Sequence, residues 1–221
     1  MIKQIMAVFS KDVRSELRTR YALNALLMFV VTTVAIILFA LRGEHAGPTV
    51  LAGMFWVAVF FTAMSGLSRS FVSEEERGTT MTLQLIASPT TVYFGKLLFN
   101  VMLTILLVAG VTIVYLAVFP AFEINDMSIF LLTVFLGSLG LASAATIIAA
   151  IIAKAGSRGT LYPVLSFPIL IVPLMTVMNA TVKSLEGTPF SDAMVDFVVL
   201  ISYVMVMTAG SVLLFDYVWK D

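Results

Sequence analysis

The chain has 221 residues, of which 60% are hydrophobic and 12% are charged, and its formal net charge is +0. In soluble globular proteins roughly a quarter of all residues are charged, so this composition predicts a membrane protein. The balanced charge gives no overall basic field for nucleic acid, and the lack of cysteine excludes disulfides, thiolate metal sites and thiol catalysis. No polar segment is long enough for a separate soluble domain, so we expect a single membrane domain over residues 1–221.

Residues 1–20 predict an amphipathic helix that lies in the plane of the membrane interface. Its apolar residues recur at helical spacing, and basic residues occupy much of the opposite face. This combination is typical of helices that lie at a membrane surface. A cytoplasmic helix packed on a partner is the alternative. The residues that we assign to the apolar face are Ile5, Phe9, Val13 and Leu17.

Six long apolar stretches follow, and each is long enough to cross a bilayer as a helix. About 20 apolar residues in a helix span a hydrocarbon core of about 30 Å. The predicted spans are residues 22–41, 48–67, 97–119, 128–153, 160–180 and 195–216. The predicted fold class is therefore an all-α membrane protein with six transmembrane helices after the interfacial helix.

The distribution of basic residues predicts the orientation of these spans. Eleven of the 13 Lys and Arg residues lie in the N-terminal segment, in the breaks after the second and fourth spans, or at the C-terminus. They are Lys3, Lys11, Arg14, Arg18, Arg20, Arg69, Arg77, Lys96, Lys154, Arg158 and Lys220. The other breaks hold only Arg42 and Lys183. Because basic loops remain in the cytoplasm, we expect both termini and the break at 68–96 to be cytoplasmic.

The spans have few of the features that a self-sufficient transporter needs. Asp196 and Asp216 lie at the ends of the sixth span, where water can reach them, and no ionisable residue lies clearly in the middle of a span. Ion-coupled carriers usually need such residues, and the chain has no G-x-x-x-x-G-K-[ST] phosphate loop. If the protein does work, we expect the energy to come from another subunit.

The fifth span carries Pro163, Pro168 and Pro173, which predict a bent or broken helix.

The sequence predicts no catalytic, cofactor or metal site. The single histidine, His45, lies in a short outer loop and is better explained as a polar loop residue than as a ligand. An intramembrane enzyme would need polar catalytic groups within its spans, and none is visible. A non-transporting membrane scaffold remains an alternative of another class.

The break at residues 68–96 is the longest and holds the most informative pattern. Its middle, residues 79–87, is moderately apolar, which predicts a short helix or turn that packs on something outside the bilayer. A partner protein and the chain's own helices are both possible. The carboxylates of Glu74, Glu75 and Glu76 are expected to be solvated or to face that partner.

This break resembles the first cytoplasmic loop of type-2 ABC exporter permeases. The pattern is Glu-x-x-x-Gly-Thr, then Leu, Ser-Pro and Gly-Lys, formed here by Glu74, Gly78, Thr79, Leu83, Ser88, Pro89, Gly95 and Lys96. In that superfamily the loop forms a coupling helix that docks in a groove of a separate ATPase subunit. The resemblance implies that docking involves Glu74, Glu75, Glu76, Arg77, Gly78, Thr79, Leu83, Leu85, Ile86 and Pro89. Three of them, Leu83, Leu85 and Ile86, would supply the apolar contact, and Gly78 would permit a tight turn.

Along its whole length the chain resembles the CcmB family, haem exporter protein B of cytochrome c maturation. The matching segments are Tyr21-Ala22-Leu23-Asn24, Phe55-Trp56, Arg69-Ser70-Phe71, Leu136-Gly137 and Arg158-Gly159. The resemblance implies a bacterial inner-membrane permease subunit that acts with the ATPase CcmA, the haem-handling protein CcmC, the small protein CcmD and, transiently, the chaperone CcmE. It also implies a second copy of the chain and ATP on the partner, with no cofactor bound here and haem handled by the complex. A permease of the same architecture that exports a lipid, glycan or drug is the alternative.

Overall fold

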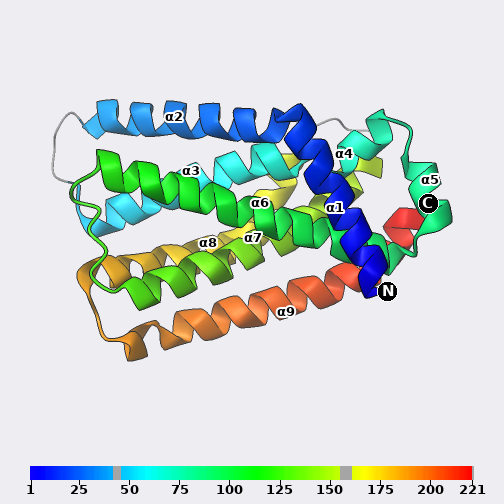
Figure 1. Cartoon of the computed structure of the whole chain (residues 1–221). Coiled ribbons are helices and arrows are strands. Elements are labelled where there is room, and N and C mark those ends of the chain that lie inside the picture. Colours follow the sequence, from blue (N-terminus) through cyan, green and yellow to red (C-terminus); the bar gives the residue numbers. More distant parts are fainter. Residues whose placement is uncertain (42–45, 155–160, 221) are drawn as a thin grey trace.

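The structure, a computed structural model, describes residues 1–41, 46–154 and 161–220, which form nine helices and no strand. The helices are α1 Ile2–Thr19, α2 Tyr21–Leu41, α3 Pro48–Leu67, α4 Arg69–Glu76, α5 Thr80–Ile86, α6 Pro89–Val118, α7 Met127–Lys154, α8 Leu161–Glu186 and α9 Phe190–Lys220. The long helices run beside one another in an elongated bundle, with the short α4 and α5 at one end (Figure 1). The prediction of an all-α protein is confirmed.

Within the described residues, five helical segments are long and apolar enough to cross a membrane. They are Pro48–Glu76, Pro89–Val118, Met127–Lys154, Ser166–Glu186 and Phe190–Trp219. The stretch predicted as the first span coincides with α2, a helix of 21 residues, of which Leu27–Leu41 counts as a shorter apolar helix. A count of six spans therefore stays a prediction.

Helix α7 is at the centre of the bundle because its small side chains let its neighbours approach closely. It packs against α6, α8 and α9 and also contacts α3 and α4. Its residues Ala144, Ala145 and Ala149 are fully buried. A Cβ atom on Gly137 would lie 2.8 Å from the Trp56 ring of α3, so a larger residue could not fit there without displacing α3.

Two expectations about the helices were wrong, and a third was wrong in part. Helix α6 begins at Pro89 and not at residue 97, because proline fits the first turn of a helix and the preceding Ser88 is extended. The break at 68–96 is therefore mostly helical. Helix α8 runs unbroken through Pro168 and Pro173, so it is not a broken helix, and a bend at these prolines stays a prediction. Asp196 is buried and forms an ion pair with Lys183 at 2.7 Å, although we expected it to face water.

The segments predicted to be cytoplasmic gather at one end of the bundle. The N-terminus, α4, α5 and the end of α9 lie together there (Figure 1). Lys183 is near the C-terminal end of α8, and the connection from α8 to α9 lies at the other end of the bundle. His45, Arg42 and Arg158 lie outside the described residues. The grouping agrees with the charge distribution, and the side of the membrane that this end faces stays a prediction.

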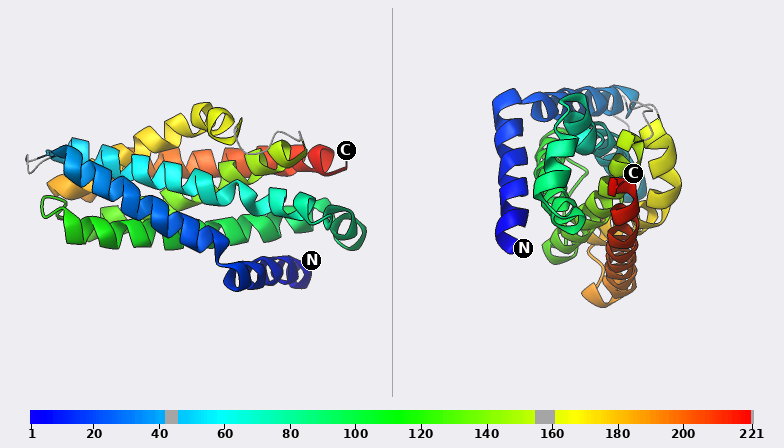
Figure 2. Two further views of the ribbon diagram at one scale, coloured as in Figure 1. Left: turned by 90° about the horizontal axis from the view of Figure 1, so that it is seen from above. Right: turned by 90° about the vertical axis from the view of Figure 1, so that its right-hand side faces the viewer.

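Helix α1 runs across the end of the bundle beside α6 (Figure 2). The side chains of Ile5, Phe9 and Val13 are half-buried, and Leu17 is 61% exposed. The deepest positions of α1 are instead Val8 and Asp12. Phe9 and Val13 pack against the hydrophobic core, so much of the predicted apolar face is covered within the chain and Leu17 is its exposed member. The placement of α1 in a membrane interface stays a prediction.

Candidate functional site

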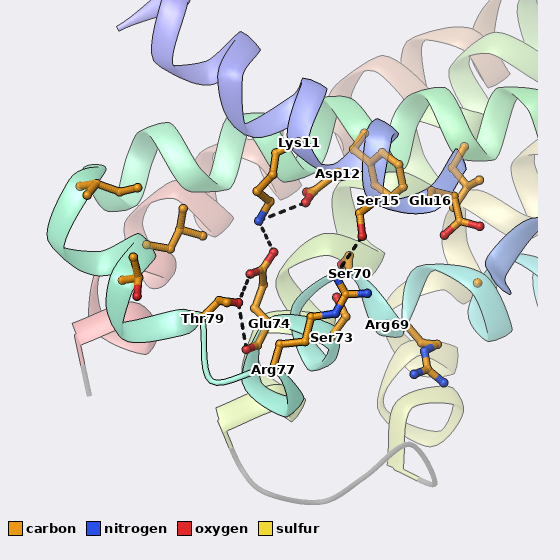
Figure 3. A pocket seen from close by; sticks show the side chains of 16 residues that line it. Lys11, Asp12, Ser15, Glu16, Arg69, Ser70, Ser73, Glu74, Arg77 and Thr79 are labelled. Carbon is orange, nitrogen blue, oxygen red and sulfur yellow. Dashed lines mark hydrogen bonds and ion pairs between the residues drawn. The ribbon is translucent and has the colours of Figure 1, made fainter. Parts of the chain in front are cut away.

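Four charged side chains from three helices form a cluster at this end of the bundle, in which Asp12, Glu74 and Lys96 are buried and Lys11 is partly exposed. We call Lys11, Asp12, Glu74 and Lys96 the charge cluster. Lys96 is 1% exposed, and its Nζ lies 2.9 Å from Glu74 Oε1 and 3.1 Å from Asp12 Oδ2 and donates a 2.6 Å hydrogen bond to the Ser70 carbonyl. Lys11 pairs with Glu74 and with Asp12 (Figure 3). The two cations balance the two anions, which offsets the cost of removing charges from water.

The charge of Lys11 is stabilised by this arrangement. Burial lowers the pKa of Lys11, but the nearby carboxylates of Asp12 and Glu74 raise it by more, so the net pKa lies above the ordinary value. Lys11 therefore stays protonated at neutral pH. Because Lys11 belongs to α1 and Glu74 to α4, this permanent charge ties the two helices together.

The charge cluster continues into the bundle as a polar stripe along α6. Lys96, Asn100 and Thr104 follow one another at intervals of four residues, so they share one face of the helix, and all three are buried. Asn100 Nδ2 donates a 2.8 Å hydrogen bond to Thr146 Oγ1 of α7 and lies 3.4 Å from Ser70 Oγ of α4. Helices α4, α6 and α7 are thus connected by polar contacts below the charge cluster.

Close packing of α1 on α6 depends on Gly95, the residue before Lys96. A Cβ atom on Gly95 would lie 2.6 Å from Val8 Cβ and 3.1 Å from the Ile5 carbonyl oxygen. The glycine lets the backbone of α1 approach α6 until Asp12 reaches Lys96. The Gly-Lys pair of the family pattern therefore has a structural explanation: one residue admits α1 and the next binds it.

A tight corner joins α4 to α5. Gly78 has a φ of +64°, in the left-handed region that favours glycine, as the expected turn requires. The Thr79 hydroxyl donates to the Glu74 carboxylate, and the Thr80 hydroxyl donates to Glu75 Oε2 at 2.7 Å. These hydrogen bonds hold α5 at a fixed angle to α4.

Helix α5 turns one apolar residue inward and displays the others. Leu83 is 6% exposed and belongs to the core. Met81 is 77% exposed, Leu85 87% and Ile86 68%. The inner side of α5 is also bonded to the C-terminal helix, since Gln84 Nε2 donates to the Trp219 carbonyl of α9.

The predicted site residues therefore fall into two groups. Glu74 and Leu83 are buried within the chain, whereas Glu75, Glu76, Arg77, Leu85 and Ile86 are exposed. Pro89 and Gly78 shape the backbone, and Thr79 bonds to Glu74. The structure thus separates the residues that could touch a partner from those that hold α5 in place. Whether a partner docks here stays a prediction.

Sequence reasoning missed Lys11, Asp12 and Lys96 as site residues, and it missed the exposed Met81. A helix start at Pro89 would have shown Lys96 to be a lone cation inside an apolar helix, which requires a buried partner. No sequence pattern identifies that partner, because Asp12 is 84 residues away from Lys96. Among the described residues no group of His, Cys, Asp and Glu is arranged to hold a metal ion.

Taken together, the apolar bundle and its charged end define a multi-pass membrane protein. The sequence matches the family described as CcmB protein over residues 3–218, so the chain belongs to the CcmB family. This family comprises membrane permease subunits of ABC type for haem transport in cytochrome c maturation, which are not catalytic themselves. The family resemblance read from the sequence is confirmed. No curated protein matches the sequence.

Proposed function

We propose that this chain couples ATP hydrolysis on a separate CcmA ATPase to haem export or to release of the haem-loaded chaperone CcmE. Family membership supports the haem-export permease. The observation that supports coupling is α5, a seven-residue helix that is fixed at the end of the bundle and displays Met81, Leu85 and Ile86.

The exposed face of α5 has the properties of a small docking surface. Three large apolar side chains on one short helix leave an apolar patch outside the apolar spans, and such patches mark interaction sites. The charges of Glu75, Glu76 and Arg77, at the end of the neighbouring α4, are exposed as well and would orient a partner. We infer that an ATPase subunit covers it.

A chain of contacts connects this surface to the membrane helices. Hydrogen bonds from Thr79 and Thr80 join α5 to α4. The charge cluster joins α4 to α1 and α6, and the Asn100–Thr146 hydrogen bond joins α6 to α7. We infer that a displacement of α5 by the ATPase is passed along these contacts to the centre of the bundle.

We place the binding of haem on the partner proteins and not on this chain. The sequence has no cysteine and one histidine, His45, so it offers no histidine within its predicted spans to bind haem iron. CcmC and CcmE would then handle haem, with CcmD as a further subunit, and this chain would bind no cofactor. Two copies of the chain would sit over a pair of ATPase subunits, in a bacterial inner membrane.

Family membership favours this function over a permease for lipids, glycans or drugs. The remaining competitor is a membrane scaffold that holds the complex together and responds to no ATPase. The two differ in whether an altered α5 surface changes cytochrome c maturation without removing the protein from the membrane.

Replacing Leu85 with aspartate should release the ATPase while the chain stays folded, because Leu85 makes little contact within the chain. Loss of a central apolar residue from an interface costs about 2 kcal/mol or more, so CcmA association should fall at least about 30-fold. The measurement is co-purification of CcmA, together with haem staining of c-type cytochromes.

Thr90→Asp is the matched control, since Thr90 is an exposed residue in the first turn of α6, where an acidic side chain is favourable. Normal CcmA binding and cytochrome staining in Leu85→Asp would exclude α5 as the docking surface.

The mass of the unaltered complex, measured by native mass spectrometry, should show two copies of the chain. A single copy beside two ATPase subunits would contradict the proposed dimer.

The proposed orientation predicts opposite labelling of the two ends. The chain has no native cysteine, so Glu75→Cys and Glu186→Cys each introduce one exposed thiol. In intact spheroplasts a membrane-impermeant maleimide should label the cysteine at 186, and it should label the one at 75 only after the membrane is opened. The reverse pattern would show that the α5 end faces the periplasm.

A further inference from the structure

A cleft of about 510 Å³ opens beside the charge cluster, between α1 and α4. Its walls come from α1, the end of α3, α4, α5 and α6 (Figure 3). Membership of the CcmB family assigns no ligand to this cleft. Because α3 ends here and α6 begins here, the cleft lies where the polar end of the molecule meets the apolar bundle.

The mouth of the cleft carries a cation that is available to a ligand. Arg77 Nη1 donates a 3.0 Å hydrogen bond to Ser15 Oγ on the opposite wall, and Ser73 lies close by (Figure 3). No carboxylate pairs with Arg77 among the described residues. Asp12, Glu16 and Glu74 also line the cleft, and so does a second cation, Arg69. The carboxylates of Asp12 and Glu74 are already neutralised by Lys11 and Lys96.

The inner part of the cleft is apolar. Phe99 and Leu103 of α6 form part of its wall, with Leu83 of α5 and Gly66 of α3. Phe99 and Leu103 lie one to two turns beyond Lys96, on the side of the bundle interior. A ligand that fills the cleft would therefore have an anionic group at Arg77 and a hydrocarbon part next to Phe99.

We propose that this cleft binds one phospholipid, with its phosphate at Arg77, Ser15 and Ser73 and part of an acyl chain along Phe99 and Leu103. Guanidinium groups bind phosphate oxygens through paired, charge-assisted hydrogen bonds, and hydroxyls add donors. The apolar wall favours a lipid over a free phosphate. The proposal rests on the predicted placement of α1 at the bilayer surface. It shares Arg77 with the proposed docking surface, but lipid retention by the chain without an ATPase tests it separately.

Binding is measured on the full-length protein in detergent by native mass spectrometry, as the number of lipids retained during titration. Phosphatidylglycerol supplies both phosphate and chains, diacylglycerol supplies chains alone, and inorganic phosphate supplies the anion alone. We expect one tightly retained phosphatidylglycerol and at least tenfold weaker retention of the other two. Arg77→Gln should weaken phosphatidylglycerol retention about tenfold, the loss expected for a charge-assisted hydrogen bond.

Arg18→Gln is the matched control, because Arg18 is exposed on α1 and does not line the cleft. A second measurement uses the unaltered chain, so it does not depend on folding of the variant: phosphatidylglycerol should slow hydrogen exchange in residues 66–79, and diacylglycerol should not. Equal retention in Arg77→Gln and Arg18→Gln, or equal protection by both lipids, would overturn the proposal. Protection by inorganic phosphate alone would show an anion site without lipid and would also overturn it.

Discussion

Replacing Lys96 with methionine should lower the stability of the chain by about 3–5 kcal/mol, the cost of breaking a buried ion pair by removing one partner. Methionine matches the length of the lysine stem but leaves Asp12 and Glu74 to share Lys11. It also leaves the Ser70 carbonyl without its donor. The thermal midpoint of the purified protein, measured in one detergent, should therefore fall sharply.

A compensating change separates charge balance from lost packing. In Lys96→Met with Glu74→Gln, one cation and one anion remain, and much of the lost stability should return. Lys3→Met is the control for removal of a lysine, since Lys3 is exposed on α1. A double variant that is less stable than Lys96→Met would show that the charge balance does not account for the effect.

Replacing Gly95 with alanine should displace α1 from α6. The new Cβ would lie 2.6 Å from Val8 Cβ, and two helix backbones must separate to relieve this contact. Overpacking of this kind costs about 1–3 kcal/mol, and it also separates Asp12 from Lys96. Because α1 carries exposed arginines, the rate of tryptic cleavage at Arg14 and Arg18 in the folded protein should rise several-fold.

Gly110→Ala is the internal control, because Gly110 lies in the same helix and a Cβ there meets no atom within 4 Å. Alanine also has a higher helix propensity than glycine, so Gly110→Ala should be neutral or slightly stabilising. Equal cleavage rates in the two variants would mean that close packing at Gly95 does not hold α1.

Much of the bundle could be predicted from the sequence. A long apolar segment in a bilayer must form a helix, because only then are its backbone N–H and C=O groups hydrogen-bonded within the segment. The span predicted at 48–67 coincides with α3, which has Gly47 before it and Pro48 in its first turn. The span predicted at 128–153 differs from α7 by one residue at each end. These boundaries are set by local chemistry, namely a proline, a glycine or a change from polar to apolar residues.

The functional end was less predictable because long-range pairing determines it. Lys96 was assigned to a loop because charge was the local signal, whereas burial depends on Asp12 and Glu74, which come from distant helices. Leu83 and Leu85 look alike in the sequence, and the fold alone shows which side of α5 faces inward, through the burial of Leu83 and the hydrogen bond from Gln84 to α9. The apolar character of α5 was predictable, and its orientation was not.

The central claim, that α5 contacts an ATPase, is tested most directly by cross-linking from single cysteines. Leu85→Cys places a thiol on the exposed side of α5, and Ile124→Cys places one in the connection before α7 at the opposite end, in a chain without native cysteine. In membranes that contain CcmA, a short thiol-directed photo-cross-linker should join CcmA to the cysteine at 85 and not to the one at 124. No CcmA adduct at position 85, or equal adducts at both positions, would contradict the proposed coupling.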